Sequence, residues 1–172
     1  EVVCPECNGK RLKKELLEVE FAETEVAAIN SFSAIELKKF IDNGLNMTEL
    51  EKAVLNTLKP EMESILNRLI KLGLSHISTD RATSSMSLGE RERLKLAKSC
   101  HDGLTNIIYI IDEPSRGVSV KESENLVSIL RELVEKGNTV VAVEHEPAVI
   151  KAADHIIELG PASGQKGGEI IF

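Results

Sequence analysis

The chain of 172 residues is acidic, with a formal net charge of −7, and 42% of its residues are hydrophobic. This length and composition allow one globular domain with a sizeable core, and the acidic balance argues against a stand-alone nucleic-acid binder, because phosphate contacts depend on Lys and Arg. An aromatic share of 3% argues against base stacking as the main activity, and no apolar run reaches the ~18 residues of a membrane helix.

The first region, residues 1–11, is rich in Cys, Gly and Pro and lacks the pattern of a signal peptide. Its cysteines, Cys4 and Cys7, bring the total to three with Cys100, and an odd number argues against a disulfide framework. We therefore expect a cytosolic protein. Within residues 12–30 a strand is predicted from alternating apolar side chains: Leu17, Val19 and Phe21.

Two capping-box patterns follow and predict two short helices. Ser33 precedes Glu36 by three residues, and Thr48 precedes Glu51 by the same spacing. In such a pair the hydroxyl and the carboxylate each satisfy a free backbone amide at the start of a helix. Gly44 is expected to end the first of these helices.

A third helix is expected to begin at Pro60, because proline is tolerated in the first turn of a helix. Gly73 is its natural end. Its apolar stripe comprises Met62, Ile65, Leu66, Leu69 and Leu72.

The pattern changes near residue 104 to one of strands and helices in alternation. Residues 107–111 and 139–143 are apolar runs, as expected of strands buried on both faces in a parallel sheet. A helix over roughly residues 121–136 separates them, and a third strand is expected near residues 155–159. This alternation predicts an α/β fold with strands near 107–112 and 139–144.

An acidic pair, Asp112 and Glu113, follows the first of these strands and is followed by Pro-Ser. Ligand chemistry in α/β proteins lies at the carboxyl ends of strands. Asp112 is suited to hold Mg²⁺, directly or through water, and Glu113 to orient or deprotonate an attacking water. The alternative interpretation is a polar strand end followed by a proline turn.

A second candidate is the start of a helix at Ser87, within residues 85–97. A helix N-terminus presents free amides and positive potential to a phosphate, and the Ser87 hydroxyl adds a donor. The alternative is that Ser87 and Glu90 only form a capping box, and both interpretations can hold together. Further along, His145 follows the second apolar strand and can donate to a phosphate, although a lone histidine there is more often structural.

These motifs together resemble the ABC ATPases. Residues 112–115 resemble the Walker B motif and catalytic Glu, residues 85–97 the signature motif, and His145 the switch histidine. The resemblance implies ATP and Mg²⁺ as cofactors and a partial P-loop fold of ABC type, preceded by a mainly helical signature subdomain. It implies catalytic roles for Glu113 and His145. The implied nucleotide-binding residues are Asp112, Ser87, Gly89 and Glu90.

Other motifs resemble the UvrA family of excision-repair proteins, and in particular its first ATPase half. The resemblance rests on residues 4–11 and 72–81 and on the C-terminal stretches at 137–161 and 167–169. The resemblance implies that Cys4 and Cys7 are half of a Cys4 zinc site whose other pair lies upstream. The alternative is a knuckle without metal. The implied organisation is a half zinc-ribbon knuckle at 1–11, the helical signature subdomain at 12–103 and the α/β part of the ATPase at 104–172.

The chain departs from the family pattern in several places. It has no G-x-x-x-x-G-K-[ST] phosphate loop and no Q-loop, which we attribute to truncation. Leu88 replaces the first signature Gly, Glu92 replaces its Gln, and Ser119 stands where the family usually has His. The chain alone is therefore expected neither to bind ATP tightly nor to hydrolyse it.

The expected function is that of an ATPase subdomain that couples ATP binding and hydrolysis to recognition of DNA damage. Expected partners are DNA through the parent protein, a second ABC module or homodimer partner, and other excision-repair subunits. The alternatives are a non-catalytic or drug-resistance type of UvrA-like module and, less consistent with the cysteine knuckle, another ABC ATPase branch. An exposed sheet edge also predicts self-association.

Overall fold

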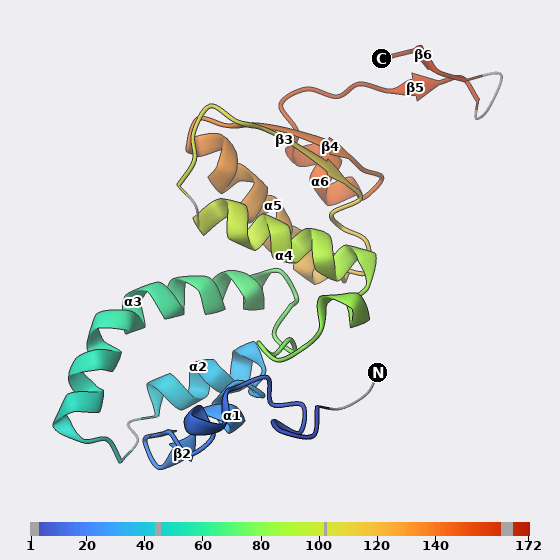
Figure 1. The fold of residues 1–172 in the computed structure, drawn as a ribbon. Coiled ribbons are helices and arrows are strands. Elements are labelled where there is room, and N and C mark those ends of the chain that lie inside the picture. The colour runs from blue at the N-terminus through green and yellow to red at the C-terminus, as the bar shows by residue number, and fades with distance from the viewer. Residues whose placement is uncertain (1–3, 44–45, 102, 163–166) are drawn as a thin grey trace.

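A computed structural model describes residues 4–43, 46–101, 103–162 and 167–172, except for the side chains of residues 120 and 121. Figure 1 shows an elongated molecule with helical hairpin and knuckle at one end, an α/β layer in the middle and a small C-terminal hairpin that extends away from it. The α/β layer carries the candidate chemistry, so the fold is described from the N-terminal region towards it.

The N-terminal region contains very little regular structure. A 3₁₀ turn, η1 (Lys14–Leu16), precedes strands β1 (Glu20–Phe21) and β2 (Thr24–Glu25) and the single-turn helix α1 (Val26–Ile29). Of the alternating residues expected to form a strand, only Phe21 lies in one. The chain turns back at once through two residues of positive φ, Ala22 and Glu23, so the strand is limited to a two-residue hairpin.

Both capping boxes predicted from the sequence are present. Ser33 caps helix α2 (Ala34–Asp42) with Glu36, and Thr48 caps helix α3 (Glu49–Lys71) with Glu51. Helix α2 ends at Asp42, and the expected stop at Gly44 lies outside the described residues. The apolar side chains between the two helices form a small core made of Ala34, Ile41, Leu55 and Leu66.

The prediction of a separate helix from Pro60 is wrong, because Pro60 lies inside α3. Proline there removes the amide that would bond to the carbonyl of Asn56, and both residues are exposed, so water can satisfy that carbonyl. Figure 1 shows α3 bending along its length. Gly73, with φ of 71°, ends the helix as predicted. Among the described residues no helix, α3 included, is both long and apolar enough to cross a bilayer.

The α/β layer is built on two parallel strands, β3 (Ile108–Asp112) and β4 (Thr139–Val143), joined through helix α5 (Val120–Glu135). Helix α4 (Leu88–His101) packs beside α5, and the short helix α6 (Pro147–Ala152) follows β4. The two strands and the crossover helix agree with the sequence prediction. The main core lies between these elements and comprises Leu72, Leu74, Ile77, Met86, Leu96, Ala97, Cys100, Ile111, Leu126, Ile129, Leu130, Leu133 and Val149.

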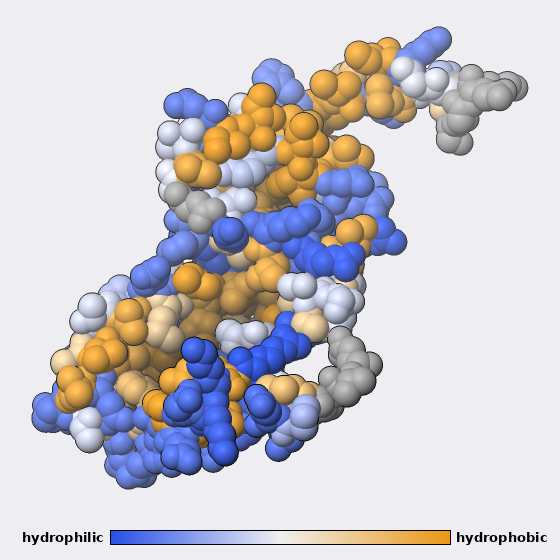
Figure 2. Space-filling view, in the orientation of Figure 1, coloured by the Kyte–Doolittle hydropathy of each residue, from blue (hydrophilic) through white to orange (hydrophobic). Residues whose placement is uncertain are grey.

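The sheet is covered on one face only, which corrects the expectation that both faces are buried. Ile111 points into the main core, whereas Ile110 is 79% exposed and Val143 is 60% exposed on the opposite face. Figure 2 shows hydrophobic side chains gathered on the surface over β3 and β4. Parallel sheets normally have both faces covered, so this face lacks a covering layer among the described residues.

The third parallel strand, expected near residues 155–159, does not join this sheet. Strand β5 (Leu159–Gly160) pairs antiparallel with β6 (Glu169–Ile170), and Figure 1 shows this hairpin away from β3 and β4. Two-residue apolar runs bury little surface, and a local hairpin closes a short loop. The local pairing therefore costs less chain entropy than extension of the distant sheet.

Candidate active site

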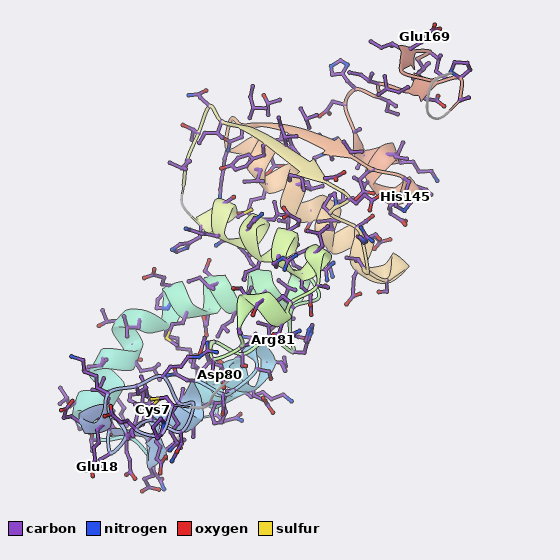
Figure 3. The ribbon with its side chains drawn as sticks, turned by 45° about the vertical axis from the view of Figure 1, so that its right-hand side comes forward. Cys7, Glu18, Asp80, Arg81, His145 and Glu169 are labelled. Carbon is purple, nitrogen blue, oxygen red and sulfur yellow. The ribbon has the colours of Figure 1, made fainter. Side chains whose placement is uncertain are left out.

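Strands β3 and β4 end side by side, which brings the predicted acidic and histidine residues to one edge of the sheet. Asp112 pairs in register with Val143, and the amide of Glu113 continues the ladder by donating to the carbonyl of Val143 at 3.0 Å. His145 follows two residues later and is exposed, like Asp112. Figure 3 shows His145 beyond the end of the sheet. Asp112, Glu113 and His145 thus come from adjacent strand ends, as the sequence predicts.

The turn after β3 is held in an unusual backbone conformation. Glu113 has φ of 43°, a left-handed conformation that a side chain disfavours. Pro114 and Ser115 behind it are buried, and the amide of Arg116 donates to the carbonyl of Glu113 at 3.0 Å. The half-buried carboxylate of Glu113 lies 3.5 Å from the guanidinium of Arg116. A strained turn next to two carboxylates is typical of functional sites, where the surrounding structure maintains the strain.

Glu144 secures this turn, and sequence reasoning missed its role. The Glu144 carboxylate accepts hydrogen bonds from the amide and the hydroxyl of Ser115, at 2.7 and 2.8 Å. It also accepts from the amides of His145 and Glu146, at 3.0 and 3.3 Å. The available signal was a carboxylate directly after an apolar strand, which is the same pattern that identified Asp112 and Glu113.

The predicted helix start at Ser87 is present as a complete capping box on α4. The Ser87 amide donates to the Glu90 carboxylate at 2.7 Å, and the Glu90 amide donates to the Ser87 hydroxyl at 3.2 Å. The Ser87 amide and the neighbouring His76 lower the pKa of Glu90 to about 2. His76 Nε2 lies 2.7 Å from this carboxylate, and Arg81 lies 3.4 Å from it. Glu90 therefore organises the helix start as a fixed anion.

Gly89 and Arg93 connect this helix to the turn after β3. A Cβ atom on Gly89 would lie 2.5 Å from the carbonyl oxygen of Arg116, so only glycine allows this approach. The buried Arg93 donates to that same carbonyl at 2.7 Å. Sequence reasoning missed Arg93, although a charged residue at a core-facing position of a helix is a signal. A role of Gly89 in nucleotide binding stays a prediction, while its packing contact is direct.

Leu88, the residue in place of the first signature glycine, is turned outwards. Its side chain is 50% exposed at the start of α4, next to the exposed Ser87. It therefore takes no part in the main core. Whether this exposed leucine affects phosphate binding stays a prediction.

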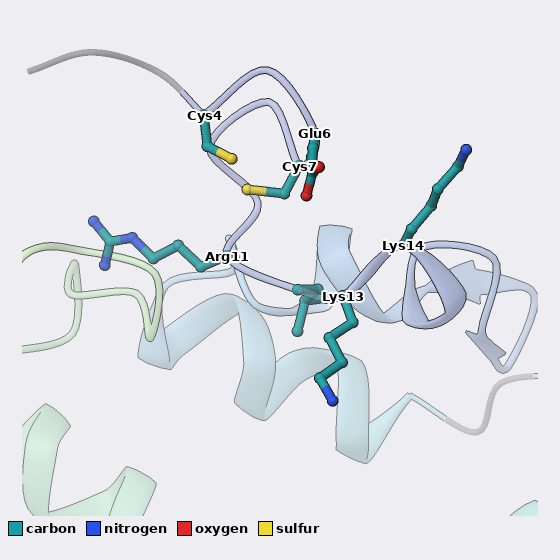
Figure 4. A pocket seen from close by; sticks show the side chains of 7 residues that line it. Cys4, Glu6, Cys7, Arg11, Lys13 and Lys14 are labelled. Carbon is teal, nitrogen blue, oxygen red and sulfur yellow. The ribbon is translucent and has the colours of Figure 1, made fainter.

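The cysteine knuckle lies at the far end of the molecule from the strand edge. Cys4 and Cys7 belong to a turn, and Figure 4 shows their sulfurs turned towards each other beside a cavity of about 320 Å³. Backbone amides of Cys7 and Glu6 lower the pKa of the Cys4 thiol. A structural zinc site needs four ligands, and the described part of the chain has no cluster of three or more His, Cys, Asp or Glu. These two cysteines alone do not fit a closed zinc site.

Comparisons with known proteins agree on one group of relatives. No family model matches the chain. The UvrABC system protein A of Staphylococcus aureus is 33% identical over 171 residues, which is 99% of this chain. That of Aquifex aeolicus is 37% identical over 169 residues. The crystal structure of UvrA2 from Deinococcus radiodurans matches 98% of the chain with a TM-score of 0.84 and 34% identity.

These matches cover different shares of this chain and of its relatives. The chain spans 18% of the length of the curated relatives and 22% of the UvrA2 chain. The similarity thus covers nearly all of this chain and one segment of each relative. The mixed helix and strand architecture, with its parallel pair, agrees with the fold predicted from the motifs. The chain is therefore a homologue of one segment of the UvrA proteins, with a partial P-loop fold of ABC type.

Proposed function

We propose that the chain is the carboxy-terminal part of an ABC ATPase module in a longer UvrA-like protein, which couples ATP binding and hydrolysis to recognition of damaged DNA. The observation that carries this proposal is the shared carboxyl edge of β3 and β4, which brings Asp112, Glu113 and His145 onto adjacent strand ends. Ligand chemistry in open α/β sheets is found at this edge.

Each residue at the edge has a distinct proposed role. Asp112 is exposed at the end of β3 and would hold Mg²⁺, which neutralises charge on the ATP phosphates. Glu113 would orient the attacking water and accept its proton, and His145 would donate to the terminal phosphate. Ser87, Gly89 and Glu90 would form the edge that faces the nucleotide of an opposite module. The helix start at Ser87 supports this, because such an end attracts phosphate.

A location within a larger module is supported by the bare face of the sheet and by the absence of a phosphate loop from the sequence. Backbone amides of that loop and its Lys are the main ligands of the triphosphate in P-loop ATPases. We therefore expect the 172-residue chain alone to be inactive and the missing loop to come from elsewhere in the longer protein. Likewise, Cys4 and Cys7 would bind zinc only with two further ligands from outside this chain.

The proposed partners follow from the names of the relatives. These relatives are called UvrABC system proteins, which supports a role alongside other excision-repair subunits. DNA contact would be made by the longer protein rather than by this acidic chain, and a second ABC module or a second copy would complete the nucleotide site. A cytosolic location stays a prediction from the cysteine count.

The test is ATP hydrolysis by the full-length protein with Glu113→Gln. This change keeps the size of the side chain and removes the proton acceptor, so we expect kcat to fall by about 10²-fold or more. Glu124→Gln on the exposed side of α5 is the matched control and should retain activity. Equal rates for Glu113→Gln and the native protein would exclude the enzymatic proposal.

A second candidate is a non-catalytic UvrA-like module, including the drug-resistance type, and the exposed Leu88 at the signature position favours it. Restoring glycine with Leu88→Gly separates the two. If Leu88 blocks the phosphate, the native full-length protein should be inactive and Leu88→Gly should gain hydrolysis. If the module is catalytic as it stands, the native protein should already turn over ATP in a manner that depends on Glu113.

A further inference from the structure

Among the described residues, Glu144 is the only one whose side chain forms hydrogen bonds to both strand ends of the candidate site. Its carboxylate receives the Ser115 amide and hydroxyl from the turn after β3, and the His145 and Glu146 amides from the end of β4. We name this set of four donors and their acceptor the Glu144 clamp. One half-buried carboxylate thereby links the loop of Glu113 to the backbone of His145.

We propose that Glu144 is a positioning residue for ATP hydrolysis, which fixes Glu113 and His145 relative to each other without contacting the nucleotide. This inference rests on the function proposed above. Glu113 and His145 would have to reach the same terminal phosphate from two different strands. Displacement of a catalytic group by about 1 Å can cost 10²-fold in rate, so a fixed separation has direct catalytic value.

The backbone of the turn explains why such a restraint is needed. Glu113 has positive φ, and the ladder contact to Val143 restrains only its amide. Within the turn there are two local backbone hydrogen bonds, from the Arg116 amide to the Glu113 carbonyl at 3.0 Å and from the Val118 amide to the Ser115 carbonyl at 2.9 Å, and neither connects it to β4. A strained turn relaxes unless neighbouring groups determine it. Glu144 provides two hydrogen bonds to Ser115, two residues from the strained position.

The turn held by the Glu144 clamp also contacts helix α4, so the clamp is connected to an element outside the two strands. Arg93 and Gly89 of α4 both meet the carbonyl of Arg116, the residue after Ser115. The turn after β3 therefore contacts both Glu144 and α4. We expect a change at Glu144 to alter the conformation of this turn and to leave the rest of the sheet unchanged.

Glutamine at position 144 removes the charge while keeping the size. A single amide oxygen can replace only one of the two carboxylate oxygens. If it takes the place of Oε2, which accepts from the Ser115 hydroxyl and the His145 and Glu146 amides, the amide nitrogen faces the Ser115 amide, from which it cannot accept. In the full-length protein we expect Glu144→Gln to lower kcat for ATP by about ten- to hundredfold. The KM for ATP should stay within about twofold, because the residue does not touch the nucleotide.

The second readout is hydrogen exchange of backbone amides in the same full-length protein. Peptides that cover residues 113–118 and 144–147 should exchange about tenfold faster in Glu144→Gln, since a charge-assisted hydrogen bond is lost. Peptides that cover residues 108–112 should not change. Ser115→Ala, which removes one donor only, should shift both readouts in the same direction by less, and it serves if Glu144→Gln fails to fold.

The outcomes separate this inference from the proposed function. Loss of activity in Glu113→Gln together with native kcat in Glu144→Gln would overturn the positioning role and leave the ATPase proposal intact. Faster exchange throughout β3 and β4 would also overturn it, because Glu144 would then act on stability in general. No effect of Glu113→Gln would instead remove the proposed function on which the inference rests. A kcat loss with unchanged KM, and faster exchange confined to the two turns, is the expected result.

Discussion

The two faces of the β3–β4 sheet differ in what covers them. One face, the closed face, lies on α5 and the main core, where Leu126, Ile129 and Leu133 are buried. The other, the open face, exposes the apolar side chains of Ile108, Ile110, Val141 and Val143 to solvent. Both faces have the composition of a core, and within the described residues only one of them is covered. Apolar residues on both faces are typical of a parallel sheet with a layer on each side, so we propose that the open face is covered in the longer protein.

The largest expected effect tests the closed face. Leu133 is 0% exposed, and Leu133→Ala should lower the free energy of unfolding by about 2–5 kcal/mol, because it removes buried methyl groups and leaves a cavity. Ile110→Thr on the open face keeps a branched side chain and should change it by no more than about 0.5 kcal/mol. Denaturant unfolding followed by circular dichroism measures both. Equal losses would contradict the difference between the faces.

The next effect concerns the capping box at the start of α4, which packs on the closed side of the sheet. Glu90→Gln keeps an oxygen that can accept from the Ser87 amide but removes the charge next to His76 and Arg81, so it should lower the free energy of unfolding at pH 7 by about 0.5–1 kcal/mol. The folded-state pKa of Glu90 lies at about 2 and below its ordinary 4.5, so its stabilisation is complete above pH 4.5 and is lost as the pH falls towards 2.

Unfolding curves of Glu90→Gln and the native chain should therefore converge across that pH window. Glu92→Gln on the same helix is the control, and its difference from the native chain should stay small at every pH. A difference for Glu90→Gln that persists undiminished at the acid end would show that the carboxylate charge is not what stabilises the helix start.

On the open face we expect a smaller change in the free energy of unfolding, and the main effect of a substitution there is on self-association of the chain. The native chain should self-associate in concentrated solution through this face and the free strand edges, and Ile110→Lys should shift it towards monomer by placing charge there. Leu50→Lys, an exposed apolar residue on α3, is the control and should still associate. Sedimentation velocity of the native chain that shows only monomer would count against this.

The smallest expected effect is chemical and leaves stability unchanged. Burial raises the pKa of the Cys100 thiol to about 11, whereas backbone amides lower the pKa of the exposed Cys4. The thiolate is the reactive form, so iodoacetamide near pH 8 should modify Cys4 first and Cys100 only after unfolding. Mass spectrometry of digests assigns the sites, and rapid labelling of Cys100 in the native chain would show that the main core opens readily.

Local signals in the sequence predicted much of the fold. The capping boxes at Ser33 and Thr48 and the stop at Gly73 are set by contacts within a few residues, and all are present. The strand–helix–strand alternation is set by the hydrophobic pattern of each segment, and it is present as well. Pro60 misled the prediction because its effect on a helix depends on which face it occupies. On the exposed face the lost hydrogen bond is replaced by water, so the helix continues through it.

The candidate site was predictable only in part, because some of its contacts join residues that are distant in the sequence. Strand ends that follow apolar runs identified Asp112, Glu113 and His145, because parallel strands align their carboxyl ends. The partners of Glu144 were not predictable, since Ser115 lies 29 residues away and meets it only through the pairing of β3 with β4. The antiparallel pairing of β5 was missed because β5 and β6 are strands of only two residues, and such short runs do not show in the sequence which partner they take.

The contact between Gly89 and the carbonyl of Arg116 sets unequal tolerance to change within one short motif. Position 88 points outwards and accommodates a leucine, so a library of substitutions there should return many folded proteins with differing surfaces. Position 89 has a backbone oxygen where any Cβ would lie, so the same library should return almost only glycine among proteins that keep α4 docked on the turn. Along this motif, freedom to vary the surface and constraint from packing therefore fall on adjacent residues.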